Sequence, residues 1–317
     1  PTQPPTPLIV AWQQNPEPAT LRSQAEGAPL LDVVSPIWWY VADDGTISGN
    51  AIPQYVDDAH SMGKTIWPAV AGLDADRNHA LLSDPERREE AAHTISSEAR
   101  AAGADGVNID LEGFRDADAD GFTALVAEVA DKVHAWGGVV SFDLVPRTDT
   151  WVVIPADLAF WSTAPQRREL AAIVDYTILM SYDQVNRYRP GGPVAAPAWV
   201  EDTLVYQLRY SDPDQLLLGV PFYGRVWDPE DLDNPRALPL YRIEDLAEGG
   251  TARWDDTFGL SRVELEDGRF LYLEDSAVIA ERLGLVDEYG LGGWAAWRLG
   301  FDSPSLWDAI ANRATGS

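Results

Sequence analysis

The chain of 317 residues holds 51 acidic and 23 basic side chains, and its formal charge of −28 disfavours nucleic acid and anionic membrane surfaces as partners. It has no cysteine, which excludes disulfides, thiolate metal sites and a cysteine nucleophile. Apolar residues make up 45% of it, enough for a large core, yet no apolar run approaches the roughly 20 residues of a membrane span.

The chain begins with a proline-rich stretch, PTQPPTP, at residues 1–7. Such a composition favours extended polyproline structure and is typical of a tether that follows a removed signal or anchor. We therefore expect a secreted or cell-surface protein. We also expect it to be a monomer, with a single domain over residues 8–317.

Short apolar runs rich in β-formers then alternate with helical stretches, which indicates parallel βαβ units. The expected strands are Leu8–Gln13, Val33–Val41, Thr65–Ala71, Gly106–Glu112, Val139–Val145, Tyr176–Asp183, Leu216–Tyr223 and Gly292–Trp297. The expected helices are Pro53–Met62, Pro85–Ala102, Ala117–Ala135, one within Pro165–Ile173, Pro197–Arg209, Ser276–Tyr289 and Pro304–Ala314.

Eight strand signals predict an α/β fold in which the sheet closes into a (β/α)8 TIM barrel. An open doubly wound sheet is the alternative, but no glycine-rich phosphate loop follows the first strand. Between the seventh and eighth strands, residues 225–275 exceed what one crossover needs, and Trp254–Tyr272 is rich in β-formers. We interpret this segment as a small insertion in the barrel.

The segment DGVNIDLEGF at Asp105–Phe114 carries the clearest chemical signal. Side chains alternate across a strand, so Asn108, Asp110 and Glu112 share one face, and the apolar residues between them share the other. The apolar face must contact the surrounding helices, which directs the polar face into the barrel. Two carboxyls there raise one another's pKa, so that one stays protonated as a proton donor. A buried polar ladder without function is the alternative.

This segment resembles the signature of glycoside hydrolase family 18, DGxDxDxE, with Asn108 where many chitinases carry aspartate. The DGxN form is typical of a bacterial branch that resembles spore-cortex and peptidoglycan-lytic enzymes. Three later segments resemble further motifs of the family in the correct strand order: LMSYD at 179–183, GVPFYGR at 219–225 and GGWAAWRLGFD at 292–302.

The resemblance implies hydrolysis of β-linked N-acetylhexosamine glycans, chitin-like or peptidoglycan-like, by a retaining, substrate-assisted mechanism without a cofactor or metal. It makes Glu112 the general acid, and it makes Asp110 and Tyr182 the groups that orient the acetamido nucleophile. The substrate-binding residues that it implies are Asn108, Met180, Asp183, Tyr223, Arg225 and Trp297.

Several of these residues have a structural alternative that the sequence leaves open. Asp183 could equally cap the end of its strand, and Arg225 could equally hold the insertion in place. Trp297 could pack at the barrel bottom, a role that Trp294 could fill instead. Asp143 shares strand parity with Ser141 and is expected beside the acidic cluster, although the family pattern assigns it no role.

Aromatic residues near the ends of the first three strands are candidates for stacking on sugar rings. They are Trp12, Trp38, Trp39, Tyr40 and Trp67, of which we expect one or two in the cleft and the others in the core. The four histidines lack the spacing of metal ligands.

A non-catalytic carbohydrate-binding protein on the same barrel is the strongest rival interpretation, because a fold does not determine a function. The intact Glu112, Asp110 and Tyr182 argue against it. A chitinase acting on long homopolymers is the second rival, which Asn108 and the lack of an evident chitin-binding module disfavour.

Overall fold

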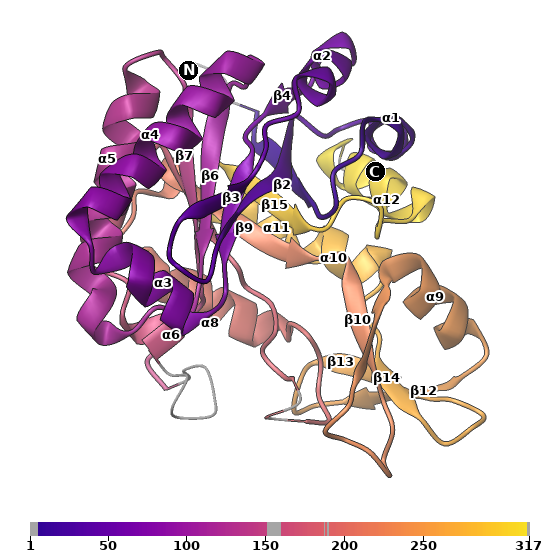
Figure 1. The fold of residues 1–317 in the computed structure, drawn as a ribbon. Helices are drawn as coiled ribbons and strands as arrows, with labels where there is room; N and C mark the ends of the chain where they lie inside the picture. The colour runs from indigo at the N-terminus through magenta and orange to yellow at the C-terminus, as the bar shows by residue number, and fades with distance from the viewer. Residues whose placement is uncertain (1–5, 151–159, 187, 189, 316–317) are drawn as a thin grey trace.

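A ring of parallel strands forms the centre of the molecule, whose computed structural model describes residues 6–150, 160–186, 188 and 190–315 (Figure 1). The strands are β1 (Leu8–Gln13), β2 (Val33–Val41), β5 (Ala69–Gly72), β6 (Gly106–Leu111), β7 (Val139–Leu144), β8 (Tyr176–Leu179), β9 (Leu216–Pro221) and β15 (Gly293–Trp297). Because β1 pairs with both β2 and β15, the ring closes and the predicted TIM barrel is confirmed.

Two short strands flank β2 at the barrel's edge. β4 (Thr65–Ile66) pairs with β2 ahead of β5, so the predicted third strand is interrupted, and β3 (Ile47–Gly49) pairs antiparallel with the far end of β2. The outward residues Val107, Ile109 and Leu111 of β6 are buried in the main apolar core. The predicted division of this strand into an apolar outer face and a polar inner face is therefore confirmed.

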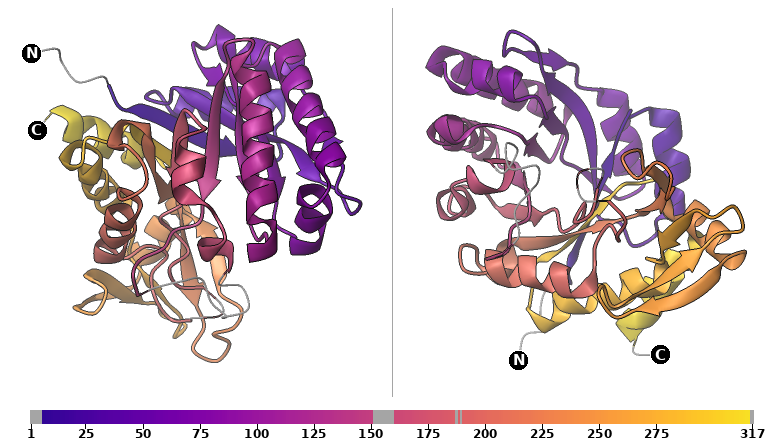
Figure 2. Two further views of the ribbon diagram at one scale, coloured as in Figure 1. Left: turned by 90° about the vertical axis from the view of Figure 1, so that its left-hand side faces the viewer. Right: turned by 90° about the horizontal axis from the view of Figure 1, so that it is seen from below.

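Helices cover the outside of the ring, and Figure 2 shows α4 and α5 side by side there. The helices of the barrel part are α1 (Pro18–Gly27), α2 (Pro53–Ser61), α3 (Ala75–Leu82), α4 (Pro85–Ala102), α5 (Ala119–His134), α6 (Phe160–Thr163), α7 (Arg167–Ala171), α8 (Pro197–Gln207), α10 (Ser276–Arg282), α11 (Gly284–Glu288) and α12 (Pro304–Thr315). The sequence did not predict α1, which buries only Leu21 and Ala25 and so has a weak apolar periodicity. None of the helices within the described ranges is long and apolar enough to cross a bilayer.

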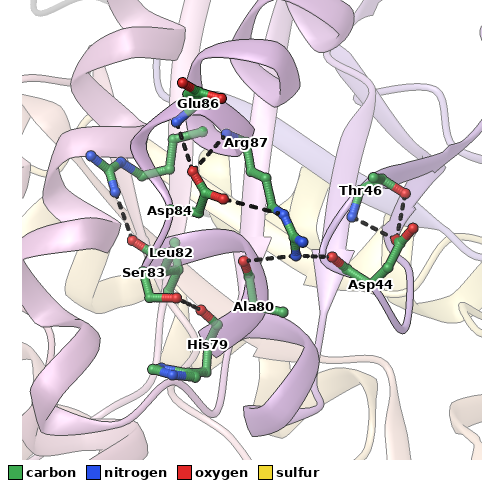
Figure 3. A network of polar contacts seen from close by, with 10 residues as sticks. Asp44, Thr46, His79, Ala80, Leu82, Ser83, Asp84, Glu86 and Arg87 are labelled. Atoms are coloured by element: carbon green, nitrogen blue, oxygen red, sulfur yellow. Dashed lines mark hydrogen bonds and ion pairs between the residues drawn. The ribbon is translucent and has the colours of Figure 1, made fainter.

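A polar network at the junction of α3 and α4 holds the turn between β2 and β3 in place (Figure 3). Asp84 caps α4 by accepting hydrogen bonds from the backbone N–H groups of Glu86 and Arg87. The Arg87 guanidinium then donates to the carbonyls of Ala80, at 3.3 Å, and Asp44. This junction anchors α3 and the β2–β3 turn together at the mouth of the barrel.

The predicted insertion between β9 and β15 is confirmed as an antiparallel sheet with the strand order β11-β10-β14-β13-β12. Its elements are β10 (Tyr223–Trp227), β11 (Arg236–Pro239), α9 (Leu240–Glu248), β12 (Thr251–Asp255), β13 (Leu260–Glu264) and β14 (Phe270–Tyr272). The chain changes sheets at Phe222, whose N–H donates to the Trp297 carbonyl at 2.7 Å and whose carbonyl accepts from Leu240. Tyr223, expected on a barrel strand, therefore already belongs to the insertion.

The insertion also grips the loop between β8 and α8. The Glu274 carboxylate accepts from the N–H groups of Val194, at 2.7 Å, and Ala195, while Arg282 donates to Glu274 at 2.9 Å and to the Ala195 carbonyl at 2.6 Å. The Trp227 indole donates to the Gly192 carbonyl at 2.8 Å. This loop follows a barrel strand at its carboxyl end, so the grip stabilises one wall of the barrel mouth.

We expect Glu274→Ala to destabilise the protein by about 3–5 kcal/mol, because it leaves the buried Arg282 cation and two backbone N–H groups unpaired. Urea unfolding measures this free energy. Asp287→Ala, which breaks the exposed Arg313–Asp287 pair, should cost less than about 1 kcal/mol and serves as the control. An equal loss of unfolding free energy in the two variants would contradict a stabilising role for the contacts that Glu274 makes with Arg282 and with the loop between β8 and α8.

Candidate active site

A cavity of about 510 Å³ opens at the carboxyl ends of the barrel strands. Glu112, Asp110, Tyr182, Met180, Asp183, Tyr223 and Trp297, all predicted from the sequence, line it. Of the aromatic candidates, Trp12 and Tyr40 also line the cavity, whereas Trp38, Trp39 and Trp67 lie buried in the apolar clusters. The cavity thus brings together residues from strands far apart in the chain.

Asn108 and Arg225 are the two predicted site residues that are absent from the described cavity lining. Asn108 is fully buried beneath it, where its side-chain amide donates to Ser141 and Asp143, each at 2.9 Å. Arg225 lies behind Asp183, as described below. Both residues contact the lining rather than the open space.

Backbone contacts hold the acidic strand in place at the cavity. The Glu112 N–H donates to the Gly72 carbonyl at 2.7 Å, and the Glu112 carbonyl accepts from the Asn78 side chain. Asp110 is buried one inward position deeper, and its Oδ1 has no hydrogen-bond partner among the described residues. Glu112 is therefore fixed at the mouth, with an unsatisfied carboxyl oxygen just below it.

Burial governs the protonation of these acids. It raises the pKa of Asp110 to about 7. It also raises the pKa of Glu112 well above the usual range, and the charges of Asp110 and Asp183 raise it further. Arg77 is the one lysine or arginine among the described residues lining the cavity, and it pairs with Asp43 at 2.6 Å. Glu112 can thus carry a proton near neutral pH and donate it.

Tyr182 presents a free hydroxyl to the cavity. Its side chain is buried, and its Oη has no hydrogen-bond partner in the part of the chain that the structure describes. Burial and the Asp143 charge raise the pKa of its phenol well above the ordinary value, which keeps the hydroxyl protonated. Tyr182 can therefore donate a hydrogen bond to an oxygen of a bound molecule.

Asp183 has a left-handed backbone conformation, and Tyr223 and Arg225 hold its side chain. Its φ of 62° lies in the left-handed region, which is uncommon for a residue other than glycine. Its carboxylate accepts from the Tyr223 hydroxyl and pairs with Arg225 at 2.8 Å. Arg225 also donates to the Val185 carbonyl at 3.0 Å, so it links the insertion to the loop after β8.

Trp297 lies beside the acids rather than at the barrel bottom. Its ring stands 5.9 Å from that of Trp12, both rings line the cavity, and the Trp297–Arg298 peptide bond is cis. Trp294 does not pack at the barrel bottom either: it belongs to the main apolar core and packs against Phe222 and against Trp307 of α12. The Trp12 and Trp297 rings provide an apolar surface on which a sugar ring could stack.

Sequence reasoning did not single out several residues of the cavity rim. Gln14, Arg77, Trp161 and Asn186 line the cavity from segments that follow the barrel strands. Segments of this kind have no strand parity, so no periodic signal could have identified them. The expectation that functional groups follow the carboxyl ends of barrel strands was the only available indication.

Most of the chain is similar to a known family of proteins. The model of a family described as glycosyl hydrolases family 18 matches residues 38–302. The chain is 23% identical over 302 residues to the cortical fragment-lytic enzyme of Bacillus subtilis, an alignment that covers 91% of this chain and 69% of that protein.

Two solved structures illustrate the shared barrel. A chitinase from Chromobacterium violaceum superposes with a TM-score of 0.84 at 21% identity, covering 98% of this chain and 99% of that one. The spore cortex-lytic enzyme SleL of Bacillus cereus gives a TM-score of 0.84 at 19% identity, covering 98% and 75% respectively. At these identities the likeness shows a common fold.

The raised pKa of Asp110 predicts a pH-dependent stability. Asp110 binds a proton more tightly in the folded than in the unfolded chain, so the wild type should lose stability relative to Asp110→Asn as the pH rises from 4 to 7. The difference should grow by up to roughly 1.4 kcal/mol per pH unit, measured by urea unfolding.

Asp44→Asn provides the control for this titration. Hydrogen bonds from Thr46 lower the pKa of the exposed Asp44 carboxyl, so its contribution is already complete above pH 5. The difference between the wild type and this variant should stay constant from pH 5 to 7. A constant difference for Asp110→Asn as well would contradict a protonated Asp110.

Proposed function

Because the chain belongs to the glycosyl hydrolases of family 18, we propose that it hydrolyses β-linked N-acetylhexosamine glycans, with the substrate's own acetamido group as nucleophile. The family match confirms the resemblance of the four sequence motifs. One observation carries the finer proposal: Glu112, Asp110 and Tyr182 line one cavity, and the last two each have a polar atom without a partner among the described residues.

In the first step, protonated Glu112 donates its proton to the glycosidic oxygen, and the bond between that oxygen and the anomeric carbon breaks. The acetamido oxygen attacks the anomeric carbon and forms a bicyclic oxazolinium ion. Tyr182 donates a hydrogen bond to this oxygen and holds it near the carbon. Asp110 accepts a hydrogen bond from the acetamido N–H and stabilises the positive charge that develops.

In the second step, the Glu112 carboxylate takes a proton from a water molecule, which attacks the anomeric carbon on the face that the leaving group vacated. The bond between the carbon and the acetamido oxygen breaks, and the acetamido group is restored. Two successive inversions leave the anomeric configuration retained. Glu112 ends the cycle protonated.

The remaining lining residues suit a sugar chain. Trp297 and Trp12 offer an apolar floor to the cleaved sugar, while Asp183, held by Tyr223 and Arg225, offers a carboxylate to its hydroxyl or acetamido groups. Met180 contributes a flexible apolar wall. In our proposal, the acetamido group of a sugar bound in this way lies against Tyr182.

We propose a chitin-like or peptidoglycan-like polymer as the substrate, cleaved at the cell surface or outside the cell, where such polymers lie. Relatives named for cortex lysis and for chitin support both polymers. Analysis of the products from N-acetylglucosamine oligomers and from purified peptidoglycan, side by side, distinguishes them.

Glu112→Gln should lower kcat by at least about 100-fold while leaving folding and sugar binding intact, because the amide keeps the volume but cannot donate the proton. Steady-state kinetics on N-acetylglucosamine oligomers measures this. Glu248→Gln, on the exposed face of the insertion helix α9, should leave kcat unchanged. Near-normal turnover of Glu112→Gln would remove Glu112 from this role.

If the acetamido group is the nucleophile, a mimic of the oxazolinium ion should inhibit, and substrates without this group should not be hydrolysed. A thiazoline derived from N-acetylglucosamine mimics the oxazolinium ion and should inhibit competitively. Substrates with a hydroxyl or free amine in place of the acetamido group should bind without turnover. Product anomers are followed by proton NMR, and inversion of configuration, or rapid hydrolysis of an aryl glucoside, would refute this mechanism.

Binding of the thiazoline without hydrolysis of any N-acetylated glycan would instead favour the carbohydrate-binding protein. In that case the same barrel and cavity would bind glycans without catalysing their hydrolysis.

A further inference from the structure

Asp143 is a third buried carboxyl in the cavity, and the mechanism above does not use it. It lies on β7 and is 4% exposed. Its Oδ1 accepts from the Asn108 amide at 2.9 Å, and its Oδ2 accepts from the Trp12 indole at 3.0 Å. Each carboxylate oxygen thus receives one N–H, which orients the group firmly.

The pairing of β6 with β7 explains why an amide stands at position 108. Asn108 lies opposite Ser141 in the register of the two strands, and its Nδ2 donates to both Ser141 and Asp143. An aspartate at 108 would place two carboxyls at this hydrogen-bond distance with no N–H between them. Asn108 and Asp143 therefore form one unit, an amide and an acid on neighbouring strands.

Other acidic groups lie around this unit, and among the described residues no lysine or arginine contributes to the pKa of Asp143. Asp110 on β6 and Glu112 just after it interact electrostatically with Asp143, and the neutral phenol of Tyr182 lies near the same group. The layer of the barrel interior that contains Trp12 also includes Val10, Val33, Ile178 and Leu217, which are apolar. Burial, followed by the charge of Asp110, raises the pKa of Asp143 well above its usual range.

We propose that Asp143 is a positioning residue that, held by Asn108 and Trp12, helps to keep Glu112 protonated across the pH range of hydrolysis. The proposal rests on the function proposed above. Both Asp143 oxygens accept N–H groups, from Asn108 and Trp12, and these hydrogen bonds favour the ionised form of Asp143 against the effect of burial. Interactions between carboxyls are reciprocal, so a charge on Asp143 disfavours ionisation of Asp110 and Glu112. Asp143 acts through these two acids and need not touch the substrate.

Asp143→Asn tests the proposal because it removes the charge and keeps the shape. The pKa of Glu112 should fall, so the alkaline limb of the kcat profile should move to lower pH, by about one unit for strongly coupled groups. In the free enzyme, the carboxyl carbon of Glu112, assigned by its loss in Glu112→Gln, should titrate at correspondingly lower pH in a carbon-13 NMR experiment.

The double variant Asn108→Asp with Asp143→Asn restores the carboxyl on the neighbouring strand. The hydrogen bond between the two side chains survives with donor and acceptor exchanged, and the amide oxygen at 143 can accept from Trp12. The alkaline limb and the Glu112 titration should therefore return toward their wild-type positions. A purely structural role for Asp143 would not predict this recovery of the pH profile.

In Asp143→Asn, the new amide N–H would face an N–H of Asn108 or Trp12, and this repulsion could prevent folding. Two further variants keep the proposal testable in that case. Asn108→Asp alone adds a carboxyl and should raise the pH at which Glu112 titrates. Ser141→Ala removes a neutral hydrogen bond to Asn108 and should leave that titration unchanged.

Unchanged titration of Glu112 in both Asp143→Asn and Asn108→Asp would overturn the proposal, as would a double variant that stays shifted. The NMR titration needs no substrate, so it decides the matter even if the wild type hydrolyses nothing. In that case the proposed function fails separately, on the wild type's own kinetics.

Discussion

The cost of burying like charges is the constraint on which this site depends. Asp110, Glu112 and Asp143 face a cavity whose described lining includes one cation, Arg77, and that cation is already paired with an exposed aspartate. Three ionised carboxyls cannot remain together there, because burial and mutual repulsion both favour the neutral forms. Protons must therefore reside in the cluster at neutral pH, and a resident proton is what acid catalysis requires.

The barrel keeps these acids buried, despite the free-energy cost, because it fixes them on rigid strands. Asp110 lies on β6 and Glu112 directly follows that strand, while β7 supplies Asp143. Trp12 from β1 reaches across the interior and donates to both Asn108 and Asp143. The outer face of β6 is buried against the main core, which prevents the strand from turning its acids to solvent. Stability of the apolar shell thus maintains the unfavourable charges inside it.

The opposite wall of the cavity depends on the insertion rather than on the barrel alone. Tyr223 and Arg225 on β10 hold Asp183, and Arg225 and Trp227 together with Glu274 hold the loop that follows it. This wall therefore consists of segments separated by up to about ninety residues. Substitutions in the insertion should therefore alter the position of the Asp183 carboxylate, even though the inserted strands lie outside the barrel.

The sequence by itself determined the barrel, the inward direction of Asn108, Asp110 and Glu112, and the family, because strand periodicity and motif order are local properties of the chain. Strand parity also indicated that Asp143 lies beside the acidic cluster. The tertiary structure alone decided that Asp143 bonds to Asn108, because the register between β6 and β7 is set by packing. It also decided that Tyr223 leaves the barrel, since Phe222 bonds to Trp297 and Leu240, and that Arg77, Trp161 and Asn186 reach the rim. Contacts between distant segments, which no local pattern encodes, determine where such residues lie.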